Sequence, residues 1–177
     1  MLNLMKMFYW DMCSRRSVYV QYLIRDLPGE FGIAVRRNYY RRKFGCDGEG
    51  LNILAGTHII NPQNIECGRY VSIGINNYIQ AGGGLVLGDN VMMGPHAKIW
   101  TQIHNFENTE EPIKKQGYSY KKVVVGEDVW IGANAFVMPG AEIGSHSIVS
   151  ACSVVGAKRY PENIILSGNP ARKIGSR

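Results

Sequence analysis

One stretch constrains the fold more than any other: in residues 125–155 a branched aliphatic residue returns at every sixth position. Glycine directly follows most of these residues, and a small or β-branched side chain stands four positions after each of the first five. A repeat of short, fixed period is interpreted first because it determines the whole architecture. The aliphatic positions are Val125, Ile131, Val137, Ile143, Val149 and Val155.

A period of six fits neither an α-helix, with apolar residues three and four apart, nor an ordinary strand, with apolar residues two apart. It fits a chain that forms a short strand, turns a corner and repeats, with three sides closing one coil. Residues eighteen apart then stack, Val125 over Ile143 and Ile131 over Val149, with about 4.8 Å between coils. We expect the glycines to supply backbone angles that other residues adopt at a cost. A β-sandwich with Gly-rich turns rarely keeps such strict spacing, so the pattern predicts a β-solenoid.

The repeat divides the chain. A looser version begins at Leu51 and slips by two residues at Ile73-Gly74 and again at Leu87-Gly88, which predicts a bulged corner near residues 82–84. It stops in the polar, charged and aromatic segment 104–122, the kind of excursion that usually forms a functional arm or flap. We therefore expect a solenoid domain at 51–177 that carries the protruding loop 104–122 and ends in a tail, 157–177, made of a last strand and a basic end.

Residues 1–50 predict an N-terminal helical cap, with one helix to about residue 26 and a second at 30–43. A cap covers the open end of a solenoid. The alternative is an interfacial anchor that brings the protein to membrane-bound substrates; the cap is favoured because basic helix pairs are also common away from membranes. The apolar start is interrupted by Lys6 and Asp11, too short to span a bilayer, and shows no signal peptide.

Charge and cysteine content narrow the partners and the compartment. The formal net charge of +6 and pI near 9.2 favour anionic partners, such as cofactor phosphates or a membrane surface. Nucleic acid is disfavoured because no reading helix or stacking platform is recognisable. The four cysteines are far apart, which indicates a reduced cytoplasm, and neither they nor His58, His96 and His146 have the spacing of a zinc site.

His104 is the first candidate for chemistry because it stands where the repeat gives way to the loop. An imidazole with an ordinary pKa near 6.5 suits a general base at neutral pH. Position alone leaves the simpler interpretation of an exposed loop histidine open.

Three segments carry a resemblance: 85–104, 123–155, in which Trp130 precedes Ile131-Gly132, and 167–174. The sequence resembles the hexapeptide-repeat acyltransferases, most of all the sugar and polysaccharide O-acetyltransferases such as the maltose and galactoside enzymes. The resemblance implies a mainly β fold, a left-handed parallel β-helix, whereas ordinary parallel crossovers are right-handed. It also implies homotrimers with active sites between subunits.

The family's catalytic histidine follows the pattern I-x-T-x-x-H, here Ile99, Thr101 and His104. The resemblance implies that His104 is the general base and that the Ala133 backbone N–H stabilises the oxyanion of the acetyl-CoA thioester. Where the family often carries Thr-Lys, this chain has Gly156-Ala157, and Lys158 is expected to replace that phosphate contact. The implied cofactor-binding set is Trp130, Ala133, Ala151, Gly156, Lys158, Arg159 and Arg172.

Asn76, Tyr78 and Gln80 lie in the coil that the family uses to hold sugar hydroxyls, and amides suit such hydroxyls. The equally simple interpretation is that these amides cap the corners of an irregular coil. The expected function is acetyl transfer from acetyl-CoA, without a metal, to a sugar or lipid-linked glycan. The location would be the cytoplasm, with peripheral contact at the inner face of the membrane. Alternatives are an antibiotic acetyltransferase, a γ-carbonic-anhydrase-like metalloenzyme and a non-catalytic solenoid.

Overall fold

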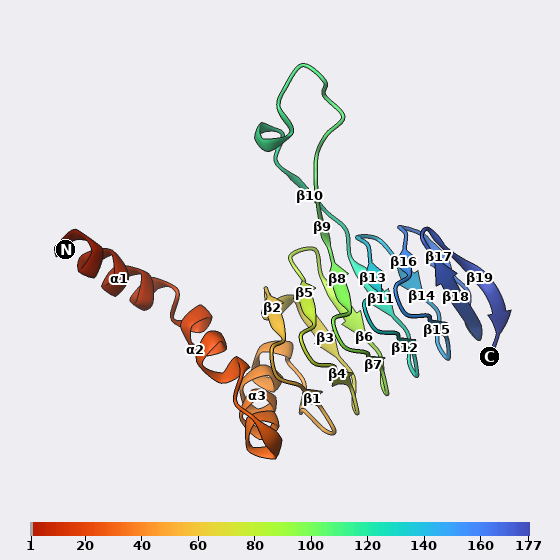
Figure 1. Ribbon diagram of the computed structural model, residues 1–177, viewed down its shortest axis with the longest axis horizontal. Helices are drawn as coiled ribbons and strands as arrows, with labels where there is room; N and C mark the ends of the chain where they lie inside the picture. Colours follow the sequence, from red (N-terminus) through yellow and green to blue (C-terminus); the bar gives the residue numbers. More distant parts are fainter. Residues whose placement is uncertain (1) are drawn as a thin grey trace.

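The computed structural model describes residues 2–177, with side chains from Leu4 onward. Three N-terminal helices precede a parallel β-solenoid, and the excursion 104–122 protrudes from the solenoid as an arm (Figure 1). The helices are α1 (Leu2–Ser14), α2 (Arg16–Arg25) and α3 (Gly29–Phe44). Within this part of the chain no helix is both long and apolar enough to cross a bilayer.

Each coil passes through three sheets in a fixed order, and we name these sheets face 1, face 2 and face 3. All their strands pair in parallel except β19, the last strand of face 1. Face 1 contains β1 (Asn52–Ile53), β4 (Ser72–Ile73), β7 (Met92–Met93), β12 (Trp130–Ile131), β15 (Ile148–Val149), β18 (Ile164–Gly168) and β19 (Ala171–Ser176). Face 2 contains β2 (His58–Ile60), β5 (Tyr78–Gln80), β8 (Lys98–Trp100), β13 (Phe136–Val137) and β16 (Val154–Val155). Face 3 contains β3 (Ile65–Cys67), β6 (Leu85–Leu87), β11 (Val123–Val125), β14 (Glu142–Ile143) and β17 (Arg159–Tyr160).

The predicted stacking is confirmed residue by residue. Val125 pairs with Ile143, Ile131 with Val149, and Val137 with Val155, each one coil apart. These side chains fill the interior of the prism and are essentially inaccessible to solvent. The aliphatic column therefore drives folding through burial, at about 25 cal/mol for each Å² of apolar surface removed from water.

The slips in the looser repeat arise because the early coils are longer. Ile59, Ile79 and Ile99 stack at intervals of twenty residues, not eighteen. The two extra residues extend face 2, where Ala81 and Thr101 also point inward and are fully buried. The Gly83 N–H donates to Thr101 Oγ1 at 2.7 Å, which holds the expected bulged corner.

The glycines that follow the aliphatic residues do a different job from the one expected. Gly126, Gly132 and Gly144 do not have positive φ. A Cβ on any of them would lie 2.5–2.6 Å from a backbone nitrogen of the next coil, so glycine is required for close approach. The left-handed angles fall instead on non-glycine corner residues, such as Asn134 at φ 57° and Cys152 at φ 60°.

Helix α3 covers the open end of the solenoid. Its Tyr40 and Phe44 join the core, and the buried Arg36 guanidinium donates to four backbone carbonyls. These belong to Ile24, Arg25 and Leu27 at the end of α2 and to Ile53 of the first coil, at 2.7–3.2 Å.

The expected single helix to residue 26 is instead two helices that meet at Arg15, whose φ is −116°. The second expected helix, 30–43, is present as α3. Figure 1 shows α1 pointing away from the solenoid.

The excursion and the C-terminus also have regular structure. Strands β9 (Gln102–His104) and β10 (Tyr118–Tyr120) form an antiparallel pair at the base of the arm, which contains the short helix η2 (Ile113–Lys115). A second short helix, η1 (Pro62–Asn64), lies in the first coil. Instead of the expected strand and tail, β18 and β19 form an antiparallel hairpin at the last coil.

Candidate active site

His104 lies at the corner between face 2 and face 3, where the chain leaves β8 and enters the arm. Its ring packs against Tyr118, its partner across the β9–β10 pair, with ring centroids 4.3 Å apart and a tilt of 43°. The imidazole is exposed, and neither ring nitrogen is hydrogen-bonded to any residue in the described part of the chain. Both nitrogens are therefore available to a ligand.

A groove of about 490 Å³ opens beside His104 along the outer side of face 2. Tyr78 and Trp100 stack in it with ring centroids 6.0 Å apart, and Phe136 meets Trp100 edge-on at 6.3 Å. Aromatic walls with a few polar groups are typical of small-molecule sites. The remaining lining residues are Ile60, Asn61, Gln80, Gln102, Ile103, Tyr118, Met138 and Pro139.

The floor of the groove is held by the bulged corner. Gln80 Nε2 donates to Gln102 Oε1 at 2.5 Å, and Gln80 Oε1 accepts from the Gly82 N–H and from Thr101 Oγ1. The Gln80 side chain is only 6% exposed. Its amide therefore stabilises the bulged corner, as expected if these amides cap the corners of an irregular coil.

Hydrogen bonds within the arm hold its conformation. The Gln116 amide nitrogen donates to the carbonyls of Asn108 and Glu111, each at 2.7 Å, and its oxygen accepts from the Asn108 N–H. At the base of the arm, Ser119 Oγ donates to Asn105 Oδ1 at 2.5 Å. The position of His104 is thus fixed from both sides of β9.

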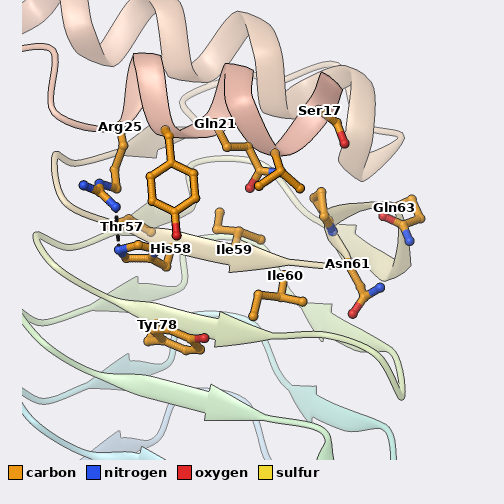
Figure 2. Close-up of a pocket in the computed structure, with 13 residues that line it drawn as sticks. Ser17, Gln21, Arg25, Thr57, His58, Ile59, Ile60, Asn61, Gln63 and Tyr78 are labelled. Carbon is orange, nitrogen blue, oxygen red and sulfur yellow. Dashed lines mark hydrogen bonds between the residues drawn. The ribbon is translucent and has the colours of Figure 1, made fainter. Parts of the chain in front are cut away.

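A second cavity of about 450 Å³ continues from the groove toward the helices, and the two share Ile60, Asn61 and Tyr78. Figure 2 shows Gln21 and Arg25 of α2 facing His58 and Ile59 of β2 across this space. Arg25 Nη1 lies 2.8 Å from His58 Nε2. Burial, and then the Arg25 charge, lower the pKa of His58, so this imidazole accepts from the guanidinium.

The predicted cofactor residues separate into two groups on one prism. Gly156 and Lys158 lie at the same corner as His104, two coils further along, and Arg159 begins β17 beside them. Trp130, 49% exposed, lies on face 1. Ala133 and Ala151 turn the corner between face 1 and face 2, and Arg172 lies on β19, also on face 1.

The corner that carries His104 is opposite face 1 in a three-sided prism, so a single chain cannot bring His104 and Trp130 together. Asn76 is also distant from His104: it turns the corner between face 1 and face 2 at φ 55° and lies outside the groove. Tyr78 and Gln80 do line the groove.

The backbone N–H groups of Ala133 and Gly156, both predicted to contact the cofactor, differ in whether they already have a hydrogen-bond acceptor. The Ala133 N–H has no acceptor among the described residues, although its carbonyl accepts from Cys152 at 2.8 Å. The Gly156 N–H, in contrast, already donates to Tyr160 Oη at 3.1 Å. Lys158 lies over the Tyr160 ring at 4.9 Å, an interaction that holds its charge near this corner.

Sequence reasoning did not identify Trp100, Gln102, Tyr118 and Phe136 as site residues. Trp100 could have been found, because it immediately precedes Thr101 of the recognised pattern. The Arg25–His58 contact joins residues 33 positions apart and has no sequence signal. In the part of the chain that the structure describes, no group of three or more His, Cys, Asp or Glu side chains is placed to hold a metal ion.

These features define the class. The chain is a hexapeptide-repeat β-solenoid with a histidine-bearing groove at one corner, and residues 122–157 match the family model described as bacterial transferase hexapeptide (six repeats). The resemblance to hexapeptide-repeat acyltransferases is therefore confirmed.

Particular relatives follow. The chain is 33% identical over 109 residues to galactoside O-acetyltransferase of Lactococcus lactis, covering 61% of this chain and 51% of that protein. It is 28% identical over 140 residues to galactoside O-acetyltransferase of Escherichia coli, covering 78% and 67%. A hexapeptide-repeat acetyltransferase of Vibrio cholerae, solved with acetyl coenzyme A, is 27% identical with a TM-score of 0.81, covering 92% and 85%. The chain spans about half the length of the first of these relatives.

Proposed function

We propose that this protein is an acetyl-CoA-dependent O-acetyltransferase that acts on a hydroxyl of a sugar or of a surface-polysaccharide precursor. The observation that carries the proposal is the free imidazole of His104 at the mouth of the Tyr78–Trp100 groove. The names of the relatives support it, because two are galactoside O-acetyltransferases and one was solved with acetyl coenzyme A.

The proposed reaction is direct transfer with both substrates bound. His104 takes the proton of the acceptor hydroxyl as the oxygen attacks the thioester carbonyl carbon. The new C–O bond forms, and the C–S bond then breaks. The thiolate leaves with the proton that the imidazolium returns. A positioned general base contributes roughly a hundred- to ten-thousand-fold in rate.

The site would form between copies of the chain in a homotrimer. One copy supplies the groove, His104 and Lys158, and its neighbour supplies face 1 and the adjoining corner, with Trp130 and the free N–H of Ala133. The separation of the two groups on one prism supports this arrangement. The extended part of acetyl-CoA would lie between the two copies, with Ala151 and Gly156 as backbone contacts. Its phosphates would meet Lys158, Arg159 and Arg172.

On the acceptor side, Tyr78 and Gln80 are the predicted residues that line the groove. Asn76 stays a prediction that only the corner of a neighbouring copy could fulfil. Soluble and lipid-linked glycans both present suitable hydroxyls, and we place the reaction in the cytoplasm, where the four free thiols stay reduced.

The test is thiol release from acetyl-CoA in the presence of sugars, nucleotide sugars and lipid-linked glycans. We expect His104→Asn to lower turnover at least a hundredfold, whereas His96→Asn, at an exposed corner with φ 58°, leaves it unchanged. Turnover that survives in the His104 variant would refute the assigned base.

The same preparation distinguishes the alternatives. Stoichiometric zinc would indicate a metalloenzyme, and acetylation of antibiotics but of no glycan would indicate a xenobiotic acetyltransferase. Failure to bind acetyl-CoA in calorimetry would leave a non-catalytic solenoid.

A further inference from the structure

The net charge of the chain resides entirely in its helices. Residues 1–44 contain nine Lys and Arg against three Asp and Glu, a difference of +6 that equals the net charge of the whole protein. Residues 45–177 contain eleven of each kind and are neutral overall. The solenoid with its arm and the helical segment therefore present very different surfaces to a charged partner.

The apolar surface is concentrated in the same segment. In α1 the side chains of Leu4, Met5, Met7, Tyr9 and Trp10 are each 61–67% exposed, and Phe8 is 55% exposed. None of the described side chains of α1 is buried, because the helix projects from the molecule (Figure 1). A contiguous apolar surface of this kind marks an interaction site on a folded protein.

The surface continues onto α2, where Val18, Tyr22 and Leu23 are 42–77% exposed. Basic side chains border it. Arg42 and Lys43, at the end of α3, share a shallow groove with Val20 and Ile24 of α2, and Arg16 begins α2 with an exposed side chain.

We infer that α1 and α2 form a docking segment that lies in the interface of an anionic lipid bilayer. The apolar side chains would enter the acyl boundary, with Trp10 and Tyr9 at headgroup depth, where such rings concentrate. The basic side chains would attract anionic headgroups. A helix of 13 residues is too short to cross the bilayer, so α1 lies along it.

Charge decides between this occupant and a second copy of the chain. Pairing of these helices with those of a second copy would bring the same excess of six positive charges against this one, and that repulsion opposes helix-to-helix pairing; the contacts of the proposed trimer lie on the solenoid instead. An anionic membrane supplies both the apolar medium and the opposite charge. The helices thus have two roles: α3 caps the solenoid, and α1 with α2 docks.

Docking through α1 and α2 would also orient the proposed active site, a step that rests on the proposed function. Helix α2 forms one wall of the cavity that continues into the His104 groove (Figure 2). A protein docked through α1 and α2 therefore presents this end of the groove toward the membrane. A lipid-linked glycan would enter from that side.

The test is cosedimentation of the full-length protein with vesicles of phosphatidylcholine alone or with one quarter phosphatidylglycerol. We expect binding to the anionic vesicles, weakened by salt, and little binding to the neutral ones. Phe8→Ser with Trp10→Ser should lower the partition coefficient by on the order of tenfold. Arg42→Gln with Lys43→Gln should lower it roughly fivefold per charge.

Matched controls lie outside the helices. Ile174→Ser removes an apolar side chain that is 66% exposed on β19, and Lys114→Gln with Lys115→Gln removes two charges from the loop arm; both should leave vesicle binding unchanged. Absence of binding to anionic vesicles would overturn the inference. So would Phe8 and Trp10 changes that alter only the oligomeric mass in sedimentation. Vesicle binding does not require turnover, so His104→Asn should bind vesicles normally, and the two proposals fail separately.

Discussion

Replacing Ala133 by proline tests the proposed oxyanion donor with little disturbance of the fold. Proline removes the backbone N–H and fixes φ near −65°. The equivalent position one coil earlier is already proline: Gly94-Pro95-His96 aligns with Gly132-Ala133-Asn134, because Met93 pairs with Ile131. The third residue is left-handed in both coils, His96 at φ 58° and Asn134 at φ 57°.

The expected magnitudes follow from the hydrogen bonds at this corner. The Ala133 N–H donates to no described residue, and the bond from the Cys152 N–H to the Ala133 carbonyl survives the change. Proline at a compatible position stabilises a protein by about 0.4–1 kcal/mol, through the unfolded state. Loss of one oxyanion-hole donor lowers kcat by about 10²- to 10³-fold. We therefore expect a protein at least as stable as the parent and nearly inactive.

The assay is thiol release under saturating acetyl-CoA together with thermal unfolding, and Ala133→Gly, which keeps the N–H, is the control. Coexpression with His104→Asn extends the test. Neither variant is active alone, but a mixed trimer contains an interface with both intact groups, so activity should return. An active, stable Ala133→Pro protein would refute the oxyanion role, and absence of complementation would refute a site shared between copies.

Three further predictions concern the buried Arg36, His58 and the thiols. Arg36→Ala leaves four carbonyls without their charged donor and should lower the free energy of unfolding by about 3–5 kcal/mol in a denaturant titration. Arg42 is exposed, so Arg42→Ala should change the free energy of unfolding by under about 0.5 kcal/mol. The pKa of His58 in the folded protein lies below its ordinary 6.5. The stabilisation by neutral His58 is therefore present above pH 6.5 and is lost as the pH falls through the lower folded-state pKa. The free energy of unfolding should decline over this range, and His58→Gln should remove that part of its pH dependence. Burial first, and then the neighbouring Cys46, raise the pKa of the Cys67 thiol, so a thiol reagent should modify it only on unfolding, whereas the exposed Cys13 and Cys152 react in the native protein.

The regular half of the fold could be predicted from the sequence because its signal is local and repeated. The column from Val125 to Val155 specifies coil length, stacking partners and burial together. The same pattern misassigned the glycines, since a residue type alone does not distinguish a positive φ from a close approach. Only the neighbouring coil shows that a Cβ on Gly132 would meet the Ala151 nitrogen at 2.5 Å.

The helical cap and the second cavity could not be predicted in the same way. Arg36 reads as one of several arginines in a basic helix, and its burial depends on carbonyls supplied by two other elements. Likewise, the contact of Arg25 with His58 joins a helix to a strand through tertiary packing. Such contacts have no period, so the chain shows them only when it is folded.

The position of His104 reflects a change in the solenoid itself. The first three coils carry two extra residues on face 2, and these extend the strand ends that bear Gln80, Trp100 and Gln102 into a ledge beside the groove. From Val125 to Val155 the stacked residues are eighteen apart, so these coils lack the two extra residues on face 2. His104 lies where the two patterns meet. In the proposed reaction the groove beside Gln80 and Trp100 would hold the acceptor, and the corner of the shorter coils would hold the thioester, so both would adjoin one imidazole.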